Sequence, residues 1–139
     1  NIPTRNAVMS SVKAAVADVF YAGALAFHTS GLAGSLTPVP TELTTFAGLV
    51  LEKQTTTAAG DEVSIMIGGE MGIRNNNFVS ARVGEQAYVD ESAASDNPTD
   101  LIASGNMATG DFTVGRITSY NVDGRTWIDL NTGAFHRQA

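Results

Sequence analysis

Hydrophobic and polar residues alternate in short runs along most of this 139-residue chain. In residues 62–67, Val63, Ile65 and Ile67 face one way, and residues 20–29 alternate in the same manner. Further strand-like segments cover residues 46–51, 87–90, 101–104, 112–120 and 125–130. A period of two is typical of half-buried β-strands. Because segments with turn-forming residues separate these runs, the pattern predicts an all-β fold, a small sandwich or barrel of short strands.

Turn-forming residues show where these strands should end. The sequence Asn-Val-Asp-Gly at residues 121–124 joins the last two strand-like runs. Asp123 and Gly124 readily adopt the positive φ angles of tight hairpin turns, so a β-hairpin is predicted here. Gly68 and Gly69 should bend the chain, and residues 75–77, all Asn, should form another turn.

The first 19 residues differ from the rest, and we interpret them as an N-terminal arm. The domain would then cover residues 20–139 and end in a short C-terminal tail. Val8, Val12 and Val19 recur at helical spacing, and Asn6 could cap a short helix. Pro3 and the β-branched valines favour an extended chain instead. Both conformations stay open, and such an arm docks either on its own domain or on a neighbour.

The composition of the chain reduces the number of possible kinds of partner. Hydrophobic residues make up 43% of the chain and charged residues 16%, a balance that excludes a disordered protein. Acidic residues outnumber basic ones by 14 to 8, so phosphates should repel the chain and nucleic acid is not an expected partner. The apolar stretch at residues 19–27 is too short for a membrane span, so a membrane is not expected either.

Residues that carry chemistry are scarce. The chain has no Cys, which excludes disulfides, thiolate metal sites and a cysteine nucleophile. His28 and His136 lie far apart in the sequence and are interpreted as a polar strand position and a tail residue. The carboxylates of residues 90–100 do not have the spacing of a calcium loop. We therefore expect no catalytic residues, no metal and no cofactor.

Three aromatic residues are candidates for contacts at an interface. Trp127 is the only tryptophan, and its neighbours predict either a place in the core or an aromatic contact with a partner. Tyr88 and Tyr120 lie on other strand-like runs. Binding of carbohydrate or of a host surface is an alternative use of these side chains.

The order of six short motifs is more informative than any one of them. The motifs are VFYAGALA at residues 19–26, FAGLV at 46–50, GDEVSI at 60–65, VGEQAYVD at 83–90, VGRI at 114–117 and WIDL at 127–130. This succession resembles the decoration, or cement, proteins of tailed-bacteriophage capsids. The resemblance implies a compact β-barrel-like module, called a β-tulip, without enzymatic activity. The alternative is a phage or bacterial β-module that binds carbohydrate or a host surface through its aromatic residues.

The resemblance also implies a structural role in the virion. Such proteins sit as homotrimers on the outer surface of the expanded head and tie neighbouring subunits of the major capsid protein together against internal DNA pressure. Their N-terminal arm commonly reaches the shell protein. The corresponding capsid-binding residues here would be Ile2, Pro3, Thr4, Arg5, Val8, Met9 and Val12. Extended arms bind by adding a strand to an exposed sheet edge, and three linked arms bind with high avidity.

Overall fold

The computed structural model describes residues 2–29, 35–41, 43–74, 82–90, 103–104 and 110–136. This part of the chain is almost entirely β-structure, which confirms the predicted fold class. The strands are β1 (Thr4–Lys13), β2 (Val19–Phe20), β3 (Leu25–His28), β4 (Leu36–Thr37), β5 (Thr45–Leu49), β6 (Gln54–Thr55), β7 (Glu62–Arg74), β8 (Gln86–Val89), β9 (Ala103–Ser104), β10 (Phe112–Val122) and β11 (Arg125–Leu130). A 3-10 turn, η3 (Thr132–Ala134), follows β11.

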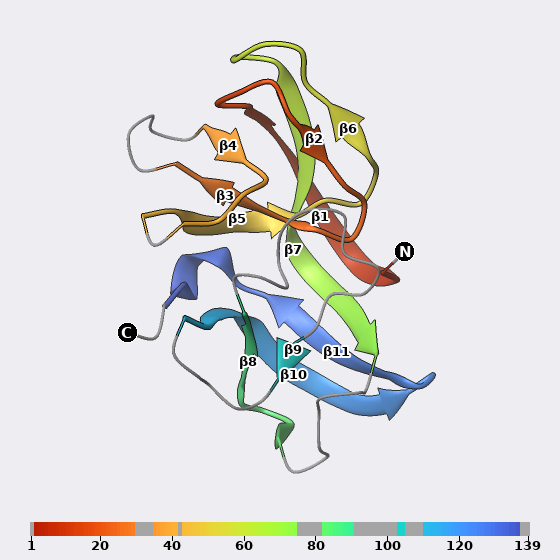
Figure 1. Ribbon diagram of the computed structural model, residues 1–139. Coiled ribbons are helices and arrows are strands. Elements are labelled where there is room, and N and C mark those ends of the chain that lie inside the picture. The colour runs from red at the N-terminus through yellow and green to blue at the C-terminus, as the bar shows by residue number, and fades with distance from the viewer. Residues whose placement is uncertain are drawn as a thin grey trace.

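The long strand β7 organises the main sheet, whose order is β4-β3-β5-β7-β11-β10-β8-β9. β1 runs antiparallel to β7 along one edge of that strand. The other edge is shared, because β5 pairs at Met66 and β11 pairs farther along, from Glu70 to Arg74. β7 therefore connects an upper half, with β3, β4 and β5, to a lower half, with β8 to β11 (Figure 1).

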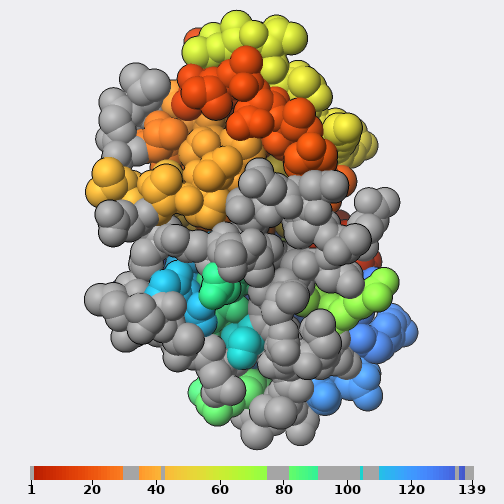
Figure 2. All heavy atoms as spheres, viewed as in Figure 1, coloured from red at the N-terminus to blue at the C-terminus, as the bar shows by residue number. Residues whose placement is uncertain are grey.

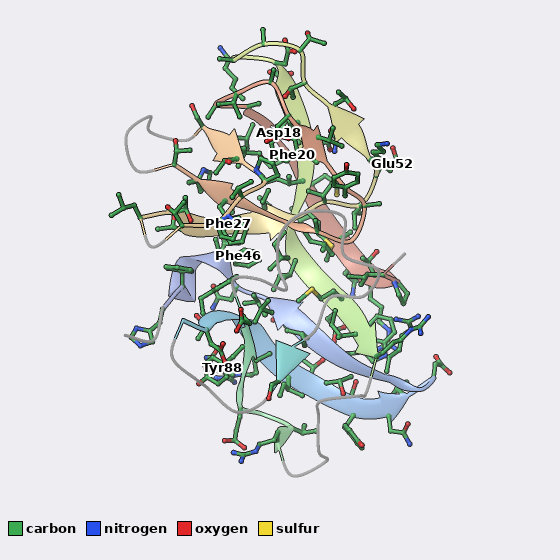
Figure 3. The ribbon with its side chains drawn as sticks, in the orientation of Figure 1. Asp18, Phe20, Phe27, Phe46, Glu52 and Tyr88 are labelled. Atoms are coloured by element: carbon green, nitrogen blue, oxygen red, sulfur yellow. The ribbon has the colours of Figure 1, made fainter. Side chains whose placement is uncertain are left out.

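Phenylalanine rings join the two halves in the larger of two hydrophobic clusters. Phe27 and Phe46 from the upper half pack against Phe112 from the lower half, with ring centroids 5.5 and 6.2 Å apart. Figure 3 shows Phe27 and Phe46 on the side of the upper half that faces the lower strands. Phe135, after η3, adds a fourth ring to Phe112 at 5.8 Å. The curled sheet thus surrounds one continuous core.

A second cluster lies on the opposite face of the upper strands. β2 and β6 form a separate two-stranded sheet there, and Phe20 of β2 is fully buried against Val63 and Ile65 of β7. Residues 46–50 are therefore buried on both faces of their strand, which explains why they form a continuous apolar run instead of alternating. In the space-filling view, most residues coloured red to yellow form the upper part and those coloured blue the lower part (Figure 2).

Gly68 and Gly69 change the direction of β7 without ending it. Gly69 has a φ of +99°, and the pairing with β1 shifts register on both sides of Val8. These irregularities are β-bulges, which bend a strand and change the face on which later side chains lie. Met66 precedes the bulge and Met71 follows it at an odd spacing, yet both reach the same core cluster.

The predicted hairpin is present. β10 and β11 pair antiparallel, and Asp123 and Gly124 between them have φ angles of 57° and 72°. Two positive φ angles at the centre of a two-residue loop define the turn type that matches the twist of the flanking strands. Beside it, the indole Nε1 of Trp127 donates a hydrogen bond of 3.2 Å to the carbonyl of Val122.

Two local predictions were wrong, and others lie outside the described residues. The helical spacing of the valines does not produce a helix, since residues 4–13 form β1, where Asn6 has a φ of 53° instead of capping a helix. Residues 20–29 are not one strand, because a turn at residues 22–23 separates β2 from β3. The expected turn at 75–77, most of the carboxylates of residues 90–100 and the first half of the strand-like segment 101–104 lie outside the described residues.

Candidate functional site

β1 is an edge strand, and this makes it the first candidate site. Within the part of the chain that the structure describes, β1 pairs along its length with β7 alone. It has ten residues, and none of them is buried. No described strand therefore lies beside the backbone N–H and C=O groups on its outer side. Such an edge is a template for pairing with another chain.

Contacts at both ends attach β1 to its own domain. At the start, the carbonyl of Pro3 accepts a hydrogen bond of 2.9 Å from the N–H of Gly72. The guanidinium of Arg5 lies over the ring of Trp127, 3.6 Å from its centroid. At the far end, the N–H of Ala14 donates to the carbonyl of Asp61 at 2.7 Å. The N-terminal segment thus docks on its own domain, one of the two arrangements expected for an arm.

The seven arm residues named from the sequence divide into two groups. Ile2 and Val12 pack against the two hydrophobic clusters, and Thr4 and Arg5 pair with the residues of β7 beside them. Val8 and Met9 instead project into solvent from the middle of β1, with exposed fractions of 54% and 45%. Pro3 is exposed as well. An apolar pair on an unpaired edge is suited to contact with a partner.

A groove of about 330 Å³ opens beside Met9. Leu51, Glu52, Gln54 and Ser64 line it together with Met9, and Figure 3 shows Glu52 at the side of the upper half near β6. Gln54 closes one wall: its side-chain oxygen accepts from the Ser64 N–H at 2.7 Å, and its Nε2 donates to the Ser64 carbonyl at 2.8 Å. The Gln54 side-chain amide therefore forms hydrogen bonds with the backbone N–H and C=O of Ser64 in β7, at a position with which β5 does not pair.

The three candidate interface aromatics lie in different surroundings. Trp127 is only 5% exposed, because Arg5 covers its ring and Gly72 lies beneath it. Tyr120 is half-buried and packs against the larger core cluster. Tyr88 is half-buried in β8 in the lower half, opposite Ser104 of β9 (Figure 3). Little of the Trp127 ring remains for stacking against a ligand.

The outer face of the lower sheet gathers arginines, which the sequence analysis missed. Strand pairing places Arg5 beside Glu70, Arg125 beside Arg74, and Arg116 beside Asp129, all on the face opposite the core. These residues come from β1, β7, β10 and β11, so no local sequence motif connects them. We call Arg5, Arg74, Arg116 and Arg125 the arginine face.

Groups suited to catalysis are dispersed in the described residues. No group of three or more His, Asp or Glu side chains there could hold a metal ion. His28 is half-buried and the Nδ1 atom of its ring has no hydrogen-bond partner, while His136 is exposed and lies far along the chain. The backbone N–H of Thr57, with the Thr57 hydroxyl and the Ala58 N–H, lowers the pKa of Asp61. Those contacts hold a turn, and Asp61 does not line the groove beside Met9.

Comparisons with known proteins add no relative. No model of a known protein family matches the chain, and no curated protein matches its sequence. The described residues contain no helix with the length and hydrophobicity needed to span a membrane. The exposed edge, the arginine face and the order of the motifs are the features that bear on function.

Proposed function

We propose that this chain is a capsid decoration protein that binds as a trimer to the outer surface of a tailed-phage head. There it would tie neighbouring subunits of the major capsid protein together and stabilise the head against the pressure of packaged DNA. The order of the six motifs supports this function, and so does the all-β fold. Binding of this kind requires surface area and main-chain hydrogen bonds but no catalytic group.

The exposed edge of β1 is the observation that carries the proposal. A ten-residue strand whose outer edge pairs with no other described strand offers a row of main-chain donors and acceptors to a strand or loop of the shell protein. Val8 and Met9, at the middle of β1, would bury apolar surface in the same contact. Long exposed edges are usually avoided because they invite association, so the retention of this one favours a role in binding.

Three copies of this edge in one trimer would make attachment strong even if each contact is weak. Once the first edge is bound, the second and third contacts become intramolecular, and avidity exceeds the affinity of a single edge by orders of magnitude. A substitution at one position of β1 then removes the same apolar contact from all three subunits of the trimer. A substitution in β1 should therefore have a large effect on head binding.

Co-sedimentation with heads of the parent phage stripped of this protein tests the proposal. The variant Val8→Glu/Met9→Glu places charges on the β1 edge, and we expect it to lose at least tenfold in occupancy. The control Leu43→Glu/Val83→Glu introduces the same charges at two other exposed apolar positions, 68% and 46% exposed. It should bind as the unmodified protein does.

Equal occupancy by the two double variants would overturn the role of β1, and absence of wild-type protein from the heads would overturn the whole proposal. Circular dichroism of each variant shows whether its sheet is intact. A variant that loses its fold is replaced by Val8→Thr/Met9→Thr, which retains strand propensity but removes apolar surface. The carbohydrate-binding alternative has no specific observation in its favour, because Arg5 covers the ring of Trp127.

A further inference from the structure

The groove beside Met9 has an apolar side that continues the larger hydrophobic cluster. Leu51 lines the groove and packs against that cluster. Met9 pairs directly opposite Met66, which is fully buried in the same cluster. Opposite residues of an antiparallel pair lie on the same face of a sheet, so Met9 extends the face through which Met66 reaches the core. The groove is therefore suited to an aliphatic chain.

The polar groups of the groove are mainly hydrogen-bond acceptors. The amide Nε2 of Gln54 already donates to the carbonyls of Ser64 and Glu52, at 2.8 and 3.2 Å. Oε1 of Gln54 accepts from the Ser64 N–H at 2.7 Å and keeps a second lone pair. The Glu52 carboxylate is exposed and forms no ion pair with another described residue (Figure 3). Only the Ser64 hydroxyl can both donate and accept, so the groove favours a ligand that donates.

Glu52 is the only charged residue among the described residues that line the groove. Its neighbour in the sequence, Lys53, places its ammonium group 5.5 Å from the centroid of the Tyr21 ring. Lys13, farther along β1, lies opposite Glu62 of β7. A cationic group that carries hydrogen-bond donors therefore complements the groove in charge as well as in hydrogen bonding.

We propose that the groove beside Met9 binds a lysine or arginine side chain from a strand that pairs with the outer edge of β1. Both side chains have donors and no acceptor. Both also place an aliphatic stem along apolar surface while the charged end stays in a polar environment. Met9 and Leu51 would contact the stem, and Glu52 would bind the charged end.

The groove and the edge of β1 are continuous, because Met9 belongs to both. A strand added to this edge would lie about 4.8 Å from β1 and place alternate side chains on the face of Met9. A long basic side chain at such a position would cross Met9 and bring its charged end toward Glu52. This inference rests on the proposed function, in which the added strand belongs to the shell protein.

The size of the groove fits this occupant. Its volume of about 330 Å³ is at the lower limit of pockets that hold small-molecule ligands, about 300–1,000 Å³. When a strand is added to a sheet edge, main-chain hydrogen bonds supply affinity and side-chain pockets supply specificity. Glu52 is then the residue that selects which segment of the shell protein pairs with β1.

Methyl NMR of protein labelled with methyl-¹³C methionine tests the inference without phage heads. Met9 lines the groove, whereas Met66 and Met71 are fully buried and serve as internal references. The probe is a heptapeptide of threonine with one central arginine, and the comparison peptides have glutamine or glutamate at the centre. The arginine peptide should shift the Met9 signal and bind about tenfold more tightly than the glutamine peptide. The glutamate peptide should bind most weakly.

Two variants with the same change in net charge separate the groove from general attraction of a cation. Glu52→Gln should reduce the preference for arginine over glutamine to less than about twofold. The control Glu85→Gln removes a carboxylate elsewhere, where Glu85 pairs with Arg82, and should retain the preference of the wild-type protein.

Three results would overturn the inference. They are an unshifted Met9 signal with the arginine peptide, equal binding of the arginine and glutamine peptides by the wild-type protein, and an unchanged preference in Glu52→Gln. The head-binding experiment separates this inference from the proposed function. If Glu52→Gln protein occupies heads as the wild-type protein does, the inference is wrong, while the decoration function stands. Absence of the wild-type protein from heads would overturn the decoration function instead.

Discussion

β1 and β11 flank the same strand, β7, and both pair with it antiparallel, yet their side chains have opposite environments. β11 has six residues, and four of them are buried. β1 has ten residues, and none is buried. Backbone pairing is therefore common to the two strands, while burial of apolar surface is concentrated in β11. Because burial is the dominant favourable contribution to folding, β11 should determine stability and β1 should be largely free to serve binding.

The difference also shows how β1 stays attached without a buried face. Its ladder with β7, the carbonyl of Pro3 and the stacking of Arg5 on Trp127 hold it in place. Trp127 lies in β11, so the strand that stabilises the core also supplies the anchor for the strand that is exposed. The two flanking strands are thus coupled at one contact. Substitutions can test each strand separately and then the contact between them.

The largest expected effect separates the two strands directly. Ile128 of β11 is fully buried, so Ile128→Ala should lower the free energy of unfolding by about 2–5 kcal/mol. Val8→Ala in β1 should change it by less than about 0.5 kcal/mol, because Val8 is 54% exposed. Urea denaturation of both variants measures the contrast. Equal destabilisation would show that β1 belongs to the stabilising core.

Substitution of Gly69 tests whether β1 can pair with β7 only when a glycine stands at the bend of β7. Its φ is +99°, and a Cβ there would lie 2.5 Å from the carbonyl oxygen of Asn6 and 2.7 Å from that of Arg5. Gly69→Ala should therefore lower the free energy of unfolding by about 1–3 kcal/mol. Gly68→Ala is the matched control, since its nearest neighbours, at 3.5 Å, are side-chain atoms of Val8. A denaturation midpoint shared by both variants would contradict this explanation of the bulge.

The hairpin turn provides a smaller effect on the β11 side. Gly124 has a φ of 72°, and a Cβ at this position would meet nothing within 4 Å. The cost of Gly124→Val is therefore one of backbone conformation alone, about 1 kcal/mol or more. Thermal and urea denaturation should both report it. An unchanged midpoint would mean that valine tolerates this turn.

The contact between the strands is tested with Arg5→Ala. The stacking of Arg5 on Trp127 at 3.6 Å should contribute about 0.5–1 kcal/mol, and its loss should expose the indole ring. Because Trp127 is the only tryptophan, its fluorescence reports this site alone, and we expect a shift to longer wavelength. Arg82→Ala, which removes an exposed ion pair with Glu85, is the control and should leave the emission unchanged.

Substitution of Asp61 should have the smallest effect on stability. The Asp61 carbonyl accepts a hydrogen bond from the Ala14 N–H at the end of β1. Its pKa is lowered because the Thr57 N–H and hydroxyl and the Ala58 N–H donate to its carboxylate. A lowered pKa in the folded state means that this stabilisation is present at neutral pH and is lost as the pH falls below about 4. The stability difference between wild type and Asp61→Asn should therefore shrink between pH 5 and pH 2. A difference that stays constant over this range would exclude the carboxylate as its source.

The same contrast explains which elements could be predicted from the sequence. Residues 112–130 alternate around an Asp-Gly pair, because one face of that hairpin is buried and its turn requires positive φ angles. β1 could not be recognised, since hydrophobic periodicity records burial and no residue of β1 is buried. The valines at helical spacing have unlike environments, with Val8 exposed and Val12 half-buried. Their spacing therefore carried no structural meaning.

The candidate site was only partly accessible to sequence analysis. The residues of β1 were named because a resemblance pointed to an N-terminal arm. The arginine face was missed, because Arg5 and Arg125 are brought to the same face only by the pairing of β1 and β11 with β7. Trp127 had two interpretations, a place in the core or a contact with a partner, and the sequence did not indicate that Arg5 would cover its ring. Long-range register decides such placements, and a local pattern does not record it.

Cryo-electron microscopy of heads that carry this protein tests the central claim most directly. The account predicts trimers on the outer surface in which the free edge of β1 lies against a strand or loop of the shell protein, at the strand spacing of about 4.8 Å. Density that places this edge in solvent, with another face of the protein against the shell, would contradict it.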